Sequence, residues 1–493
     1  MYLLGYDIGS SSIKAAIVDV RTGEAIATAQ SPEREMNMLA LQAGWAEQSP
    51  EIWWEHICKA TKQMLSTASI SSEDIKGIGI AYQMHGLVAV DKNQAVLRPS
   101  IIWCDSRAVA IGQEAFEAIG AEACLSCTLN SPANFTASKL KWVKDNEPEV
   151  YAQIDKIMLP GDFIAMKLTG DILSTPSGLS EGILWDFQKN EVAALILDHY
   201  GFDRSLIPSI QDTFSLQGKV SKAAAEETGL VAGIPVTYRA GDQPNNALAL
   251  NVLQPGEVAA TGGTSGVVYG VLDKAVYDSK SRVNAFAHVN HQKEQARIGI
   301  LLCINGAGIQ YKWVKENLAA NGTSYLEMNQ RAAAVPVGSD GLRILPFGNG
   351  AERMLENKNP GAYITNLQFN RHRPAHFYRA ALEGVAFSFV HGIRILQELG
   401  VDSAVIKVGN DNLFRSEIFS KTICNLLQNR IEIVETNGAV GAAKAAGVAT
   451  GIYASIEEAM QSIKVLDTYE ADRHVAEYER AFEAWESDLM KVI

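Results

Sequence analysis

A short loop of small and hydroxyl-bearing residues follows an apolar run close to the start of the chain. The run ends in Asp7, residues 9–12 read Gly-Ser-Ser-Ser, and residues 15–27 read as strand, turn and strand. Phosphate loops of the P-loop and Rossmann types open a helix instead. In a tight hairpin the amides of residues 9–12 can point at phosphate oxygens, and Asp7 can hold a cation through its waters. The pattern indicates a phosphate cradle, with an ordinary surface hairpin as the alternative for this segment alone.

The same arrangement recurs about 250 residues later in the chain. Residues 257–270 read as strand, small hydroxyl-rich loop and strand, and the loop contains Gly263, Thr264, Ser265 and Gly266. Two such hairpins favour a duplicated architecture, in which two related domains each aim one loop at a nucleotide that lies between them.

The length of the chain also supports a division into domains, because 493 residues exceed what one hydrophobic core usually organises. A short strand at residues 234–238 leads into a turn with Asp242, and Pro244 is well suited to begin a helix. We place the boundary just after this helix. This predicts an N-terminal domain of residues 1–250 and a C-terminal domain of residues 251–493.

The net charge of −13 at pH 7 argues against nucleic acid as a partner, since such a partner requires a basic stripe. No apolar run approaches the roughly 18 residues that a membrane span needs. The first motif begins by residue 7, which leaves no room for a signal peptide. We therefore expect a cytoplasmic protein with neither a nucleic-acid nor a membrane partner.

The six cysteines are scattered, and Cys124 and Cys127 form the one C-x-x-C pair. The sequence offers no second pair and no histidine near it, so a zinc or redox site lacks its other residues. We favour reduced cysteines that pack as small hydrophobic residues over these two alternatives.

The remaining pattern predicts alternating helices and strands. In the first half, Ser49 and Pro50 suit the start of a helix to about residue 66, strands are expected near 78–81 and 87–90, and residues 110–230 read as mixed helices and loops. The second half is expected to contain strands near 257–270, 297–304 and 404–408, and helices near 308–319, 374–399, 415–427, 438–450 and 472–493.

Two polar segments are candidates for chemistry. Asp242 lies between a strand and the start of a helix, where a carboxylate can stand at the lip of a cleft or simply cap the helix. Gln83, Met84, His85 and Gly86 lie between two strands and could line a small pocket, although a lone histidine is more often structural.

A third segment combines an aromatic ring with an acid. Trp103 offers an apolar face of the kind on which sugars stack, and Asp105 is a polar group two residues later. Trp103 could equally belong to the hydrophobic core.

From residue 1 to about 450, the chain resembles the FGGY carbohydrate kinases, members of the actin-like, sugar-kinase and Hsp70 superfamily. Residues 7–11 are similar to the family's first phosphate motif, 263–266 to the second, 241–243 to the catalytic segment, 306–310 to a nucleotide-contacting helix start, and 438–443 to a close-packed terminal helix. The resemblance implies an α/β fold of two actin-like (ribonuclease H-like) domains with an interdomain catalytic cleft.

The resemblance also implies phosphoryl transfer from MgATP to a sugar hydroxyl, with Asp242 accepting the proton and Asp7 holding Mg²⁺ through water. Sugar contacts are implied for Gln83, Met84, His85, Trp103, Asp105, Asp242 and Gln243. Nucleotide contacts are implied for Gly9, Ser10, Ser11, Ser12, Lys14, Gly263, Thr264, Gly306, Gln310, Gly409, Asn410 and Asn412. Closure driven by the sugar is expected to exclude water, and a homodimer is expected by the same resemblance.

Within the family, residues 83–86, 97–99 and 103–107 look most like xylulokinases, which implies phosphorylation of D-xylulose to D-xylulose 5-phosphate. Kinases of gluconate, ribulose or glycerol are the alternatives. Tyr82 stands where xylulokinases usually carry glycine, which adds bulk that could reshape the sugar pocket. Residues 408–415, with Asn410, Asp411 and Asn412, replace the usual run of glycines on the adenine side and could alter the base contacts.

Two other classes of protein share such loops. A nucleotide-driven chaperone like Hsp70 needs a peptide-binding module after its nucleotide domain, and little chain remains after residue 450. A sugar-sensing regulator is expected to add a DNA-binding element or to lose the base, and the sequence shows neither. An enzyme is therefore the favoured class.

Overall fold

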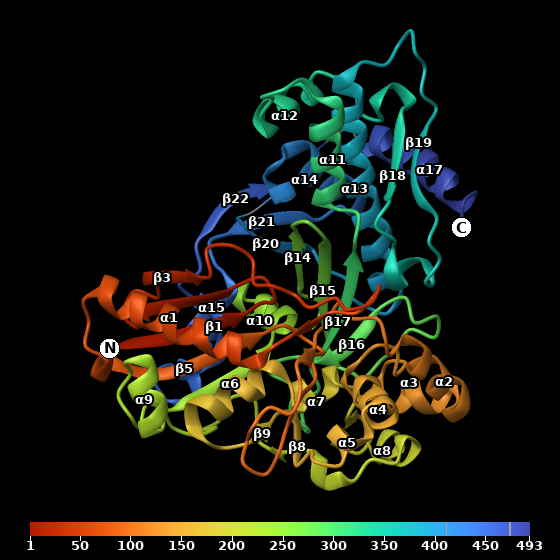
Figure 1. Ribbon diagram of the computed structural model, residues 1–493. Helices are drawn as coiled ribbons and strands as arrows, with labels where there is room; N and C mark the ends of the chain where they lie inside the picture. Colours follow the sequence, from red (N-terminus) through yellow and green to blue (C-terminus); the bar gives the residue numbers. More distant parts are fainter. Residues whose placement is uncertain (411, 473–474) are drawn as a thin grey trace.

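The computed structural model describes residues 1–410, 412–472 and 475–493. These residues form two large β-sheets, of five and seven strands, with helices on their faces (Figure 1). The first sheet is built from the N-terminal half of the chain and the second from the C-terminal half. The predicted α/β class is confirmed.

The first sheet contains the predicted N-terminal hairpin. Its strands are β1 (Tyr2–Ile8), β2 (Ile13–Asp19), β3 (Ala25–Ser31), β5 (Ile75–Tyr82) and β13 (Val236–Gly241), in the spatial order β13-β5-β1-β2-β3. The pairs β1–β2 and β2–β3 are antiparallel, whereas β1–β5 and β5–β13 are parallel. The carboxyl ends of β1, β5 and β13, which precede Gly9, Gln83 and Asp242, thus lie side by side at the same end of the sheet.

The second sheet repeats this plan and adds an antiparallel strand at each edge. Its strands are β14 (Val258–Gly262), β15 (Gly266–Leu272), β16 (Asn284–Ala287), β17 (Ile298–Ile304), β20 (Val405–Gly409), β21 (Arg430–Val434) and β22 (Val465–Tyr469). The order β17-β15-β14-β20-β21 matches β3-β2-β1-β5-β13, and the parallel and antiparallel pairs fall at the same places. This repetition supports the duplicated architecture inferred from the two loops.

Two helices lie between the sheets (Figure 1). Helix α15 (Gly438–Ala449) comes from the second half of the chain but packs on β1, β5 and β13, and α10 (Asp242–Ala249) packs on α15 and on β14. A Cβ on Gly5 would lie 2.0 Å from the carbonyl oxygen of Ala439, and one on Gly79 only 1.9 Å from that of Ala442. Because only glycine permits this approach, α15 is held tightly against the first sheet.

The outer faces carry the longer helices. On the first sheet these are α1 (Pro50–Ala68) and α6 (Pro160–Thr169), and on the second α13 (Pro374–Glu398) and α14 (Glu417–Leu427). The other helices are α2 (Val109–Ile119), α3 (Ala121–Thr128), α4 (Thr136–Asn146), α5 (Pro148–Tyr151), α7 (Pro176–Glu181), α8 (Ala194–Tyr200), α9 (Lys222–Thr228), α11 (Gly308–Leu318), α12 (Tyr325–Ala333), α16 (Ile456–Met460) and α17 (Val475–Met490). Short ribbons pair β4 (Glu47–Gln48) with β7 (Ser100–Ile101), β6 (Val88–Val90) with β8 (Lys156–Met158), β9 (Leu173–Ser174) with β12 (Ser209–Ile210), β10 (Trp185–Asp186) with β11 (Glu191–Val192), and β18 (Arg343–Phe347) with β19 (Gly361–Thr365).

Two details of the helix starts differ from the prediction. Helix α10 begins at Asp242 rather than at Pro244, which a helix tolerates because the amides of its first turn have no partner within the helix. Ser49 precedes α1 as predicted, but its side chain makes no capping hydrogen bond. Proline at the first position of α1 is enough to start the helix there.

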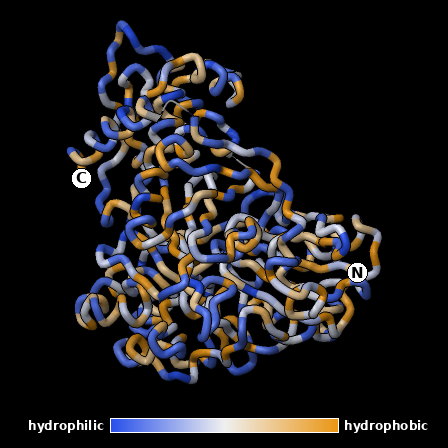
Figure 2. The backbone as a smooth tube through the Cα atoms, turned by 180° about the vertical axis from the view of Figure 1, so that it is seen from behind, coloured by the Kyte–Doolittle hydropathy of each residue, from blue (hydrophilic) through white to orange (hydrophobic). Residues whose placement is uncertain are grey.

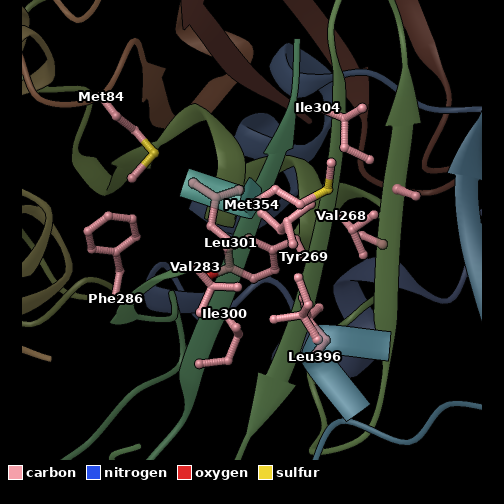
Figure 3. Packing of buried hydrophobic residues seen from close by; sticks show 14 of the residues in the cluster. Met84, Val268, Tyr269, Val283, Phe286, Ile300, Leu301, Ile304, Met354 and Leu396 are labelled. Atoms are coloured by element: carbon pink, nitrogen blue, oxygen red, sulfur yellow. The ribbon is translucent and has the colours of Figure 1, made fainter. Parts of the chain in front are cut away.

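Hydrophobic packing joins the two halves. One buried cluster includes Met84 from the first half together with Phe286 of β16 and Leu301 of β17, and the close-up shows Met84 and Phe286 on the same side of this cluster (Figure 3). Hydrophobic and hydrophilic stretches alternate along the described backbone (Figure 2). Over the described ranges, no helix combines the length and apolar character that crossing a membrane would require. All six cysteines are free thiols.

Candidate functional site

The first loop is held in shape by bonds to its own carbonyl groups and to neighbouring segments. The Gly9 amide donates to the Ser12 carbonyl oxygen at 3.1 Å, and the Gln48 side-chain amide donates to the Ser10 carbonyl oxygen at 2.7 Å. Trp103 donates its indole N–H to the Ser10 hydroxyl at 3.2 Å and is half exposed. It therefore lies on the exposed rim beside the first loop and not in the core. Lys14, opposite Asp7 across the hairpin, is exposed.

The second loop rests on the start of α11. The amide of Gly308 donates to the Gly263 carbonyl oxygen at 2.9 Å, and that of Ile309 to the Thr264 carbonyl oxygen at 3.1 Å. A Cβ on Gly308 would lie 2.3 Å from the Gly263 oxygen, so glycine is required for this contact. Gln310 is in the first turn of the same helix. Its Oε1 is buried and has no hydrogen-bond partner within the described part of the chain.

Two further predicted nucleotide residues are held by the second sheet. Gly306 packs so closely on β18 that a Cβ would lie 1.5 Å from the Pro346 carbonyl oxygen. Gly409 ends β20, which pairs in parallel with β14, and Asn410 follows it on the surface. The adjoining turn η5 (Asn412–Arg415) contacts the end of β14 at Gly262. Asp411 lies outside the described residues.

Two carboxylates lie close together in the region where strands β1 and β13 end and helix α15 begins. Asp7 is at the end of β1, and Asp242 is the first residue of α10, directly after β13. Burial, and after it the charge of Asp7, raises the pKa of Asp242 to about 7, against hydrogen bonds from Gln243. Burial also raises the pKa of Asp7, although the charge of Lys14 acts to lower it. The two carboxylates are therefore partly removed from water, and little positive charge lies near them to stabilise their ionised forms.

The predicted sugar residues lie beside Asp242 at the end of β5. The side-chain amide of Gln83 is buried, and neither of its polar atoms has a hydrogen-bond partner in the described ranges. His85 has a left-handed backbone (φ 61°), and its ring lies against Phe135 and Phe286, with centroids 4.7 Å and 5.4 Å away. Burial lowers the pKa of His85 to about 3, so its imidazole is neutral at physiological pH.

Asp105 is placed differently from the other predicted sugar residues. Its carboxylate is fully buried and pairs with Arg107, whose Nη2 donates to Oδ2 at 2.7 Å, and the Ala46 amide donates to the same oxygen at 2.6 Å. Oδ1 accepts from the Arg107 amide at 2.9 Å. Both oxygens are therefore engaged by protein groups, and the side chain supports the segment that carries Trp103.

Tyr82, predicted to add bulk to the sugar pocket, is fully buried in the N-terminal core. A Cβ on Gly161 would lie 2.0 Å from the Tyr82 ring, and one on Gly178 would lie 3.0 Å from its hydroxyl. The ring thus occupies space that α6 and α7 leave open at these two glycines. Its bulk is therefore accommodated within the core.

Three residues near His85 escaped the sequence reasoning. The ammonium of Lys139 donates to the carbonyl oxygens of His85 and Ile102 at 2.9 Å and 3.0 Å, and burial lowers its pKa to about 7. Glu181 is buried, and it accepts the His85 amide N–H. Arg353, from the second half of the chain, lies over the Phe135 ring at 5.4 Å. No motif marks these positions, because each is brought in from a separate helix or turn.

A cavity lies elsewhere, in the second half of the chain. A space of about 360 Å³ between α13, α17 and β18 is lined by residues that include Glu383, Phe387 and Trp485. None of the predicted site residues borders it. Among the described residues, no group of three or more His, Cys, Asp or Glu side chains gathers as a metal site, so a cation at Asp7 would need ligands from another source.

Comparisons with known proteins identify the family and the fold. Residues 2–249 match the N-terminal domain, and residues 258–450 the C-terminal domain, of the FGGY family of carbohydrate kinases. The chain is 27% identical to the xylulose kinase of Bacillus subtilis, over 99% of this chain and 96% of that protein. It is 29% identical to the L-xylulose/3-keto-L-gulonate kinase of Escherichia coli, over 94% and 91%. The crystal structure of xylulose kinase from Rhodospirillum rubrum superimposes with a TM-score of 0.90 at 26% identity, covering 100% of this chain and 99% of that one.

Proposed function

Because the chain belongs to the FGGY family of carbohydrate kinases, we propose that it transfers the γ-phosphoryl group of ATP to a hydroxyl of D-xylulose, which gives D-xylulose 5-phosphate. The observation that carries the chemistry is the pair of carboxylates, Asp7 and Asp242, between two hairpin loops of the same topology. Similarity to xylulose kinases over nearly the full chain supports the choice of sugar.

In this proposal Asp242 accepts the proton of the attacking sugar hydroxyl. A general base works best when its pKa lies near the working pH, and a value of about 7 suits that task. Phosphoryl transfer requires little covalent work from the protein, so holding the reacting oxygens in line is the main contribution. Gln243 hydrogen bonds to the Asp242 carboxylate and so orients it.

The two loops hold the nucleotide. Amides of residues 10–12 and 263–264 steady the phosphates, while Gly306, Gln310, Gly409 and Asn410 line the side of the base and ribose. Lys14 provides one exposed cation near the first loop. These assignments rest on the position of each residue after the ends of β1, β14, β17 and β20.

Asp7 is suited to Mg²⁺, because its carboxylate is a hard oxygen ligand and Mg²⁺ is usually held by one or two protein carboxylates. Within the described part of the chain, no cluster of three or more potential ligands surrounds it. Mg²⁺ usually keeps its waters and shares substrate phosphates, and when bound it would neutralise charge on the transferring phosphoryl group. The raised pKa of Asp7 also fits a carboxylate that lacks a strong cationic partner in the protein alone.

The sugar contacts proposed are Gln83, Met84, His85 and Trp103, with Asp105 in support. Gln83 offers a buried amide with free donors and acceptors, which a hydroxyl-rich ligand would satisfy. A ketose between the Trp103 rim and His85 would present one hydroxyl to Asp242. Closure of the two domains around it would exclude water as a competing acceptor.

A second candidate substrate is a sugar acid, and one observation favours it. Arg353 makes no ion pair with any residue in the described ranges, although it lies beside Phe135 in the first half of the chain. Arg353 donates to the Ser131 hydroxyl at 3.4 Å, and a cation that lacks a carboxylate partner in the described ranges could hold the carboxylate of a substrate such as a keto-gulonate or gluconate. D-Xylulose is preferred because Gln83 and His85 require no charge on the ligand.

The test is ADP release with MgATP across a panel of D-xylulose, L-xylulose, D-ribulose, gluconate, 3-keto-L-gulonate and glycerol. Native protein and Asp242→Ala are compared. D-Xylulose should give the highest kcat/KM, and the variant should lose about 10²- to 10⁴-fold while still binding ADP. Preference for a sugar acid would move the assignment to the second candidate, and turnover of Asp242→Ala near the native rate would overturn the role of the base.

The proposal includes a cytoplasmic homodimer, the arrangement expected from family resemblance. Light scattering on the purified protein tests the dimer, and fractionation of cells that express it tests the compartment. A monomer at micromolar concentration would remove this part and leave the catalytic assignment intact.

A further inference from the structure

Glu181, the last residue of α7, places its carboxyl group between the two segments that carry the proposed sugar site. Its Oε2 accepts the amide N–H of His85 at 3.3 Å. Its backbone carbonyl oxygen lies 2.8 Å from His85 Nδ1. Both carboxyl oxygens would lie 3.1 Å from a Cβ on Gly241, the residue before Asp242. One residue therefore touches both the pocket segment and the catalytic segment.

These contacts determine how the imidazole of His85 is presented. A backbone carbonyl can only accept, so the bond at Nδ1 requires that nitrogen to carry the proton. Nε2 is then an acceptor, and it makes no hydrogen bond with any group in the described part of the chain. The bond at the His85 amide holds the left-handed backbone (φ 61°) that places this ring against Phe135 and Phe286.

The environment of Glu181 favours the uncharged acid. The buried Arg239 pairs with Asp162, its Nε lying 3.1 Å from Oδ1, so that cation is already matched by another carboxylate. The Tyr82 hydroxyl lies close to Glu181, and Lys139 is bound to carbonyl groups. Burial, and after it the charges of Asp242 and Asp162, raises the pKa of Glu181 well above its usual value. A neutral carboxyl can stand close to Asp242 without repelling it.

We propose that Glu181, backed by Tyr82, is a positioning residue of the sugar site, which locks the backbone and tautomer of His85 so that Nε2 accepts a hydrogen bond from a sugar hydroxyl. This inference rests on the proposed function for its substrate, but the arrangement of His85 can be measured without turnover. It also explains why Tyr82 is accommodated here, since its hydroxyl faces Glu181 while its ring fills the space over Gly161.

The test compares Glu181→Ala and Glu181→Gln with the native protein in steady-state kinetics with D-xylulose and MgATP. Alanine removes the acceptor for the His85 amide and should raise KM for the sugar about 10-fold or more, with KM for ATP within about twofold of native. Glutamine keeps an acceptor oxygen at the same place and is isosteric with the neutral acid. It should hold KM for the sugar within about threefold of native.

Glu383→Gln is the matched control. Glu383 is also a buried glutamate, but it lies in the second half of the chain and binds the amide of Gly338 and the hydroxyl of Ser339. This variant should leave both KM values unchanged even where it lowers the melting temperature. Native KM for the sugar in Glu181→Ala, or a Glu181→Gln variant as impaired as Glu181→Ala, would overturn the proposal.

A second pair of variants serves if Glu181→Ala does not fold. Tyr82→Phe removes only the hydroxyl that faces Glu181, and Tyr6→Phe removes a buried hydroxyl on the neighbouring strand, which bonds Thr61 at 2.6 Å. Tyr82→Phe should raise KM for the sugar several-fold, whereas Tyr6→Phe should not. Equal KM values in the two variants would remove Tyr82 from the proposal.

The imidazole itself gives a readout that needs no substrate. ¹⁵N spectra of the side chain, assigned with a His85→Gln variant, should show a neutral His85 with its proton on Nδ1 in the native protein and also in Glu181→Ala, which keeps the backbone carbonyl. The backbone amide signal of His85 should shift in Glu181→Ala, which loses the acceptor of that amide, and much less in Glu181→Gln. A proton on Nε2 in the native protein, or an amide signal that does not shift in Glu181→Ala, would overturn the proposal. If no sugar is turned over but these spectra behave as expected, the proposed substrate is wrong and the positioning role stands.

Discussion

Gly438 packs directly against the carboxylate of Asp7, since a Cβ on this glycine would lie 2.7 Å from Oδ2. Gly438 begins α15, a helix from the second half of the chain, whereas Asp7 ends the first strand of the first half. The Asn245 side chain donates to the Gly438 carbonyl oxygen at 3.0 Å and ties α10 to the same point. The start of α15 therefore limits where the Asp7 carboxylate can lie.

Gly438→Ala should impair use of the metal more than binding of the sugar. The added methyl group would displace Asp7 or shift α15, since 2.7 Å is closer than such atoms approach. We expect kcat to fall about 10- to 100-fold at fixed Mg²⁺, and a higher Mg²⁺ concentration for half-maximal rate. The measurement is a Mg²⁺ titration of the initial rate. Gly182→Ala is the control, because its nearest contacts of 3.4 Å are ordinary; equal behaviour of the two variants would contradict the prediction.

Gly308→Ala should act on the nucleotide alone. Its methyl group would meet the Gly263 carbonyl oxygen at 2.3 Å and push the second loop away from α11. KM for ATP is expected to rise about 10-fold or more, with KM for the sugar within about twofold of native. Isothermal titration with ADP checks the binding step without catalysis. A variant whose ADP affinity matches native would show that the second loop does not hold the nucleotide.

Local patterns predicted the parts of the fold that are continuous in sequence. The hairpins around residues 9–12 and 263–266, helix α1 and helix α15 all lie where alternation, turn residues and glycines indicated. The start of α10 was misplaced by two residues, since proline is tolerated anywhere in a first turn. Such signals depend only on neighbours along the chain, so they can be read without knowing the tertiary structure.

These local patterns could not predict contacts between segments that are distant in sequence. Glu181 and His85 are separated by 96 positions, and nothing in residues 176–181 indicates that α7 ends beneath the pocket. Trp103 was undecided between core and rim because an isolated tryptophan fits both, and its exposure depends on the Ser10 loop. Asp105 suited a ligand contact by residue type, yet Arg107 two residues later engages its carboxylate. Packing in three dimensions decides such cases.

The pH dependence of kcat/KM should report the base. Asp242 acts only when ionised, and its pKa of about 7 predicts that kcat/KM falls about tenfold per pH unit below that value. His85, with a pKa of about 3, contributes nothing in this range. Any decline above pH 7 would come from Lys139, whose pKa is lowered to about 7, and Lys139→Arg should remove it. A flat profile from pH 5 to 8 would contradict the assignment of Asp242 as base.

Asp242→Asn should make the protein more stable at neutral and basic pH while it abolishes turnover. In the folded protein the pKa of Asp242 is about 7, well above the roughly 3.9 of an unfolded chain. Between these values the folded state binds more protons than the unfolded state, so native stability falls as pH rises from about 4 to about 7. Asparagine does not titrate and avoids this loss. The variant should therefore gain about 1 to 3 kcal/mol of unfolding free energy at pH 8, and the gain should vanish near pH 4.

Urea unfolding of native protein and Asp242→Asn at pH 4, 6 and 8 measures this gain. Asp19→Asn is a control of opposite sign, because hydrogen bonds from Arg21 hold the pKa of Asp19 below its usual value. Asp19 contributes stability above its unfolded pKa and loses that contribution as pH falls through its folded pKa, so Asp19→Asn should be the less stable variant at pH 8 and approach native in acid. An Asp242→Asn protein that is no more stable than native at pH 8 would mean that the carboxylate has a compensating partner, and would contradict the raised pKa on which its role as base rests.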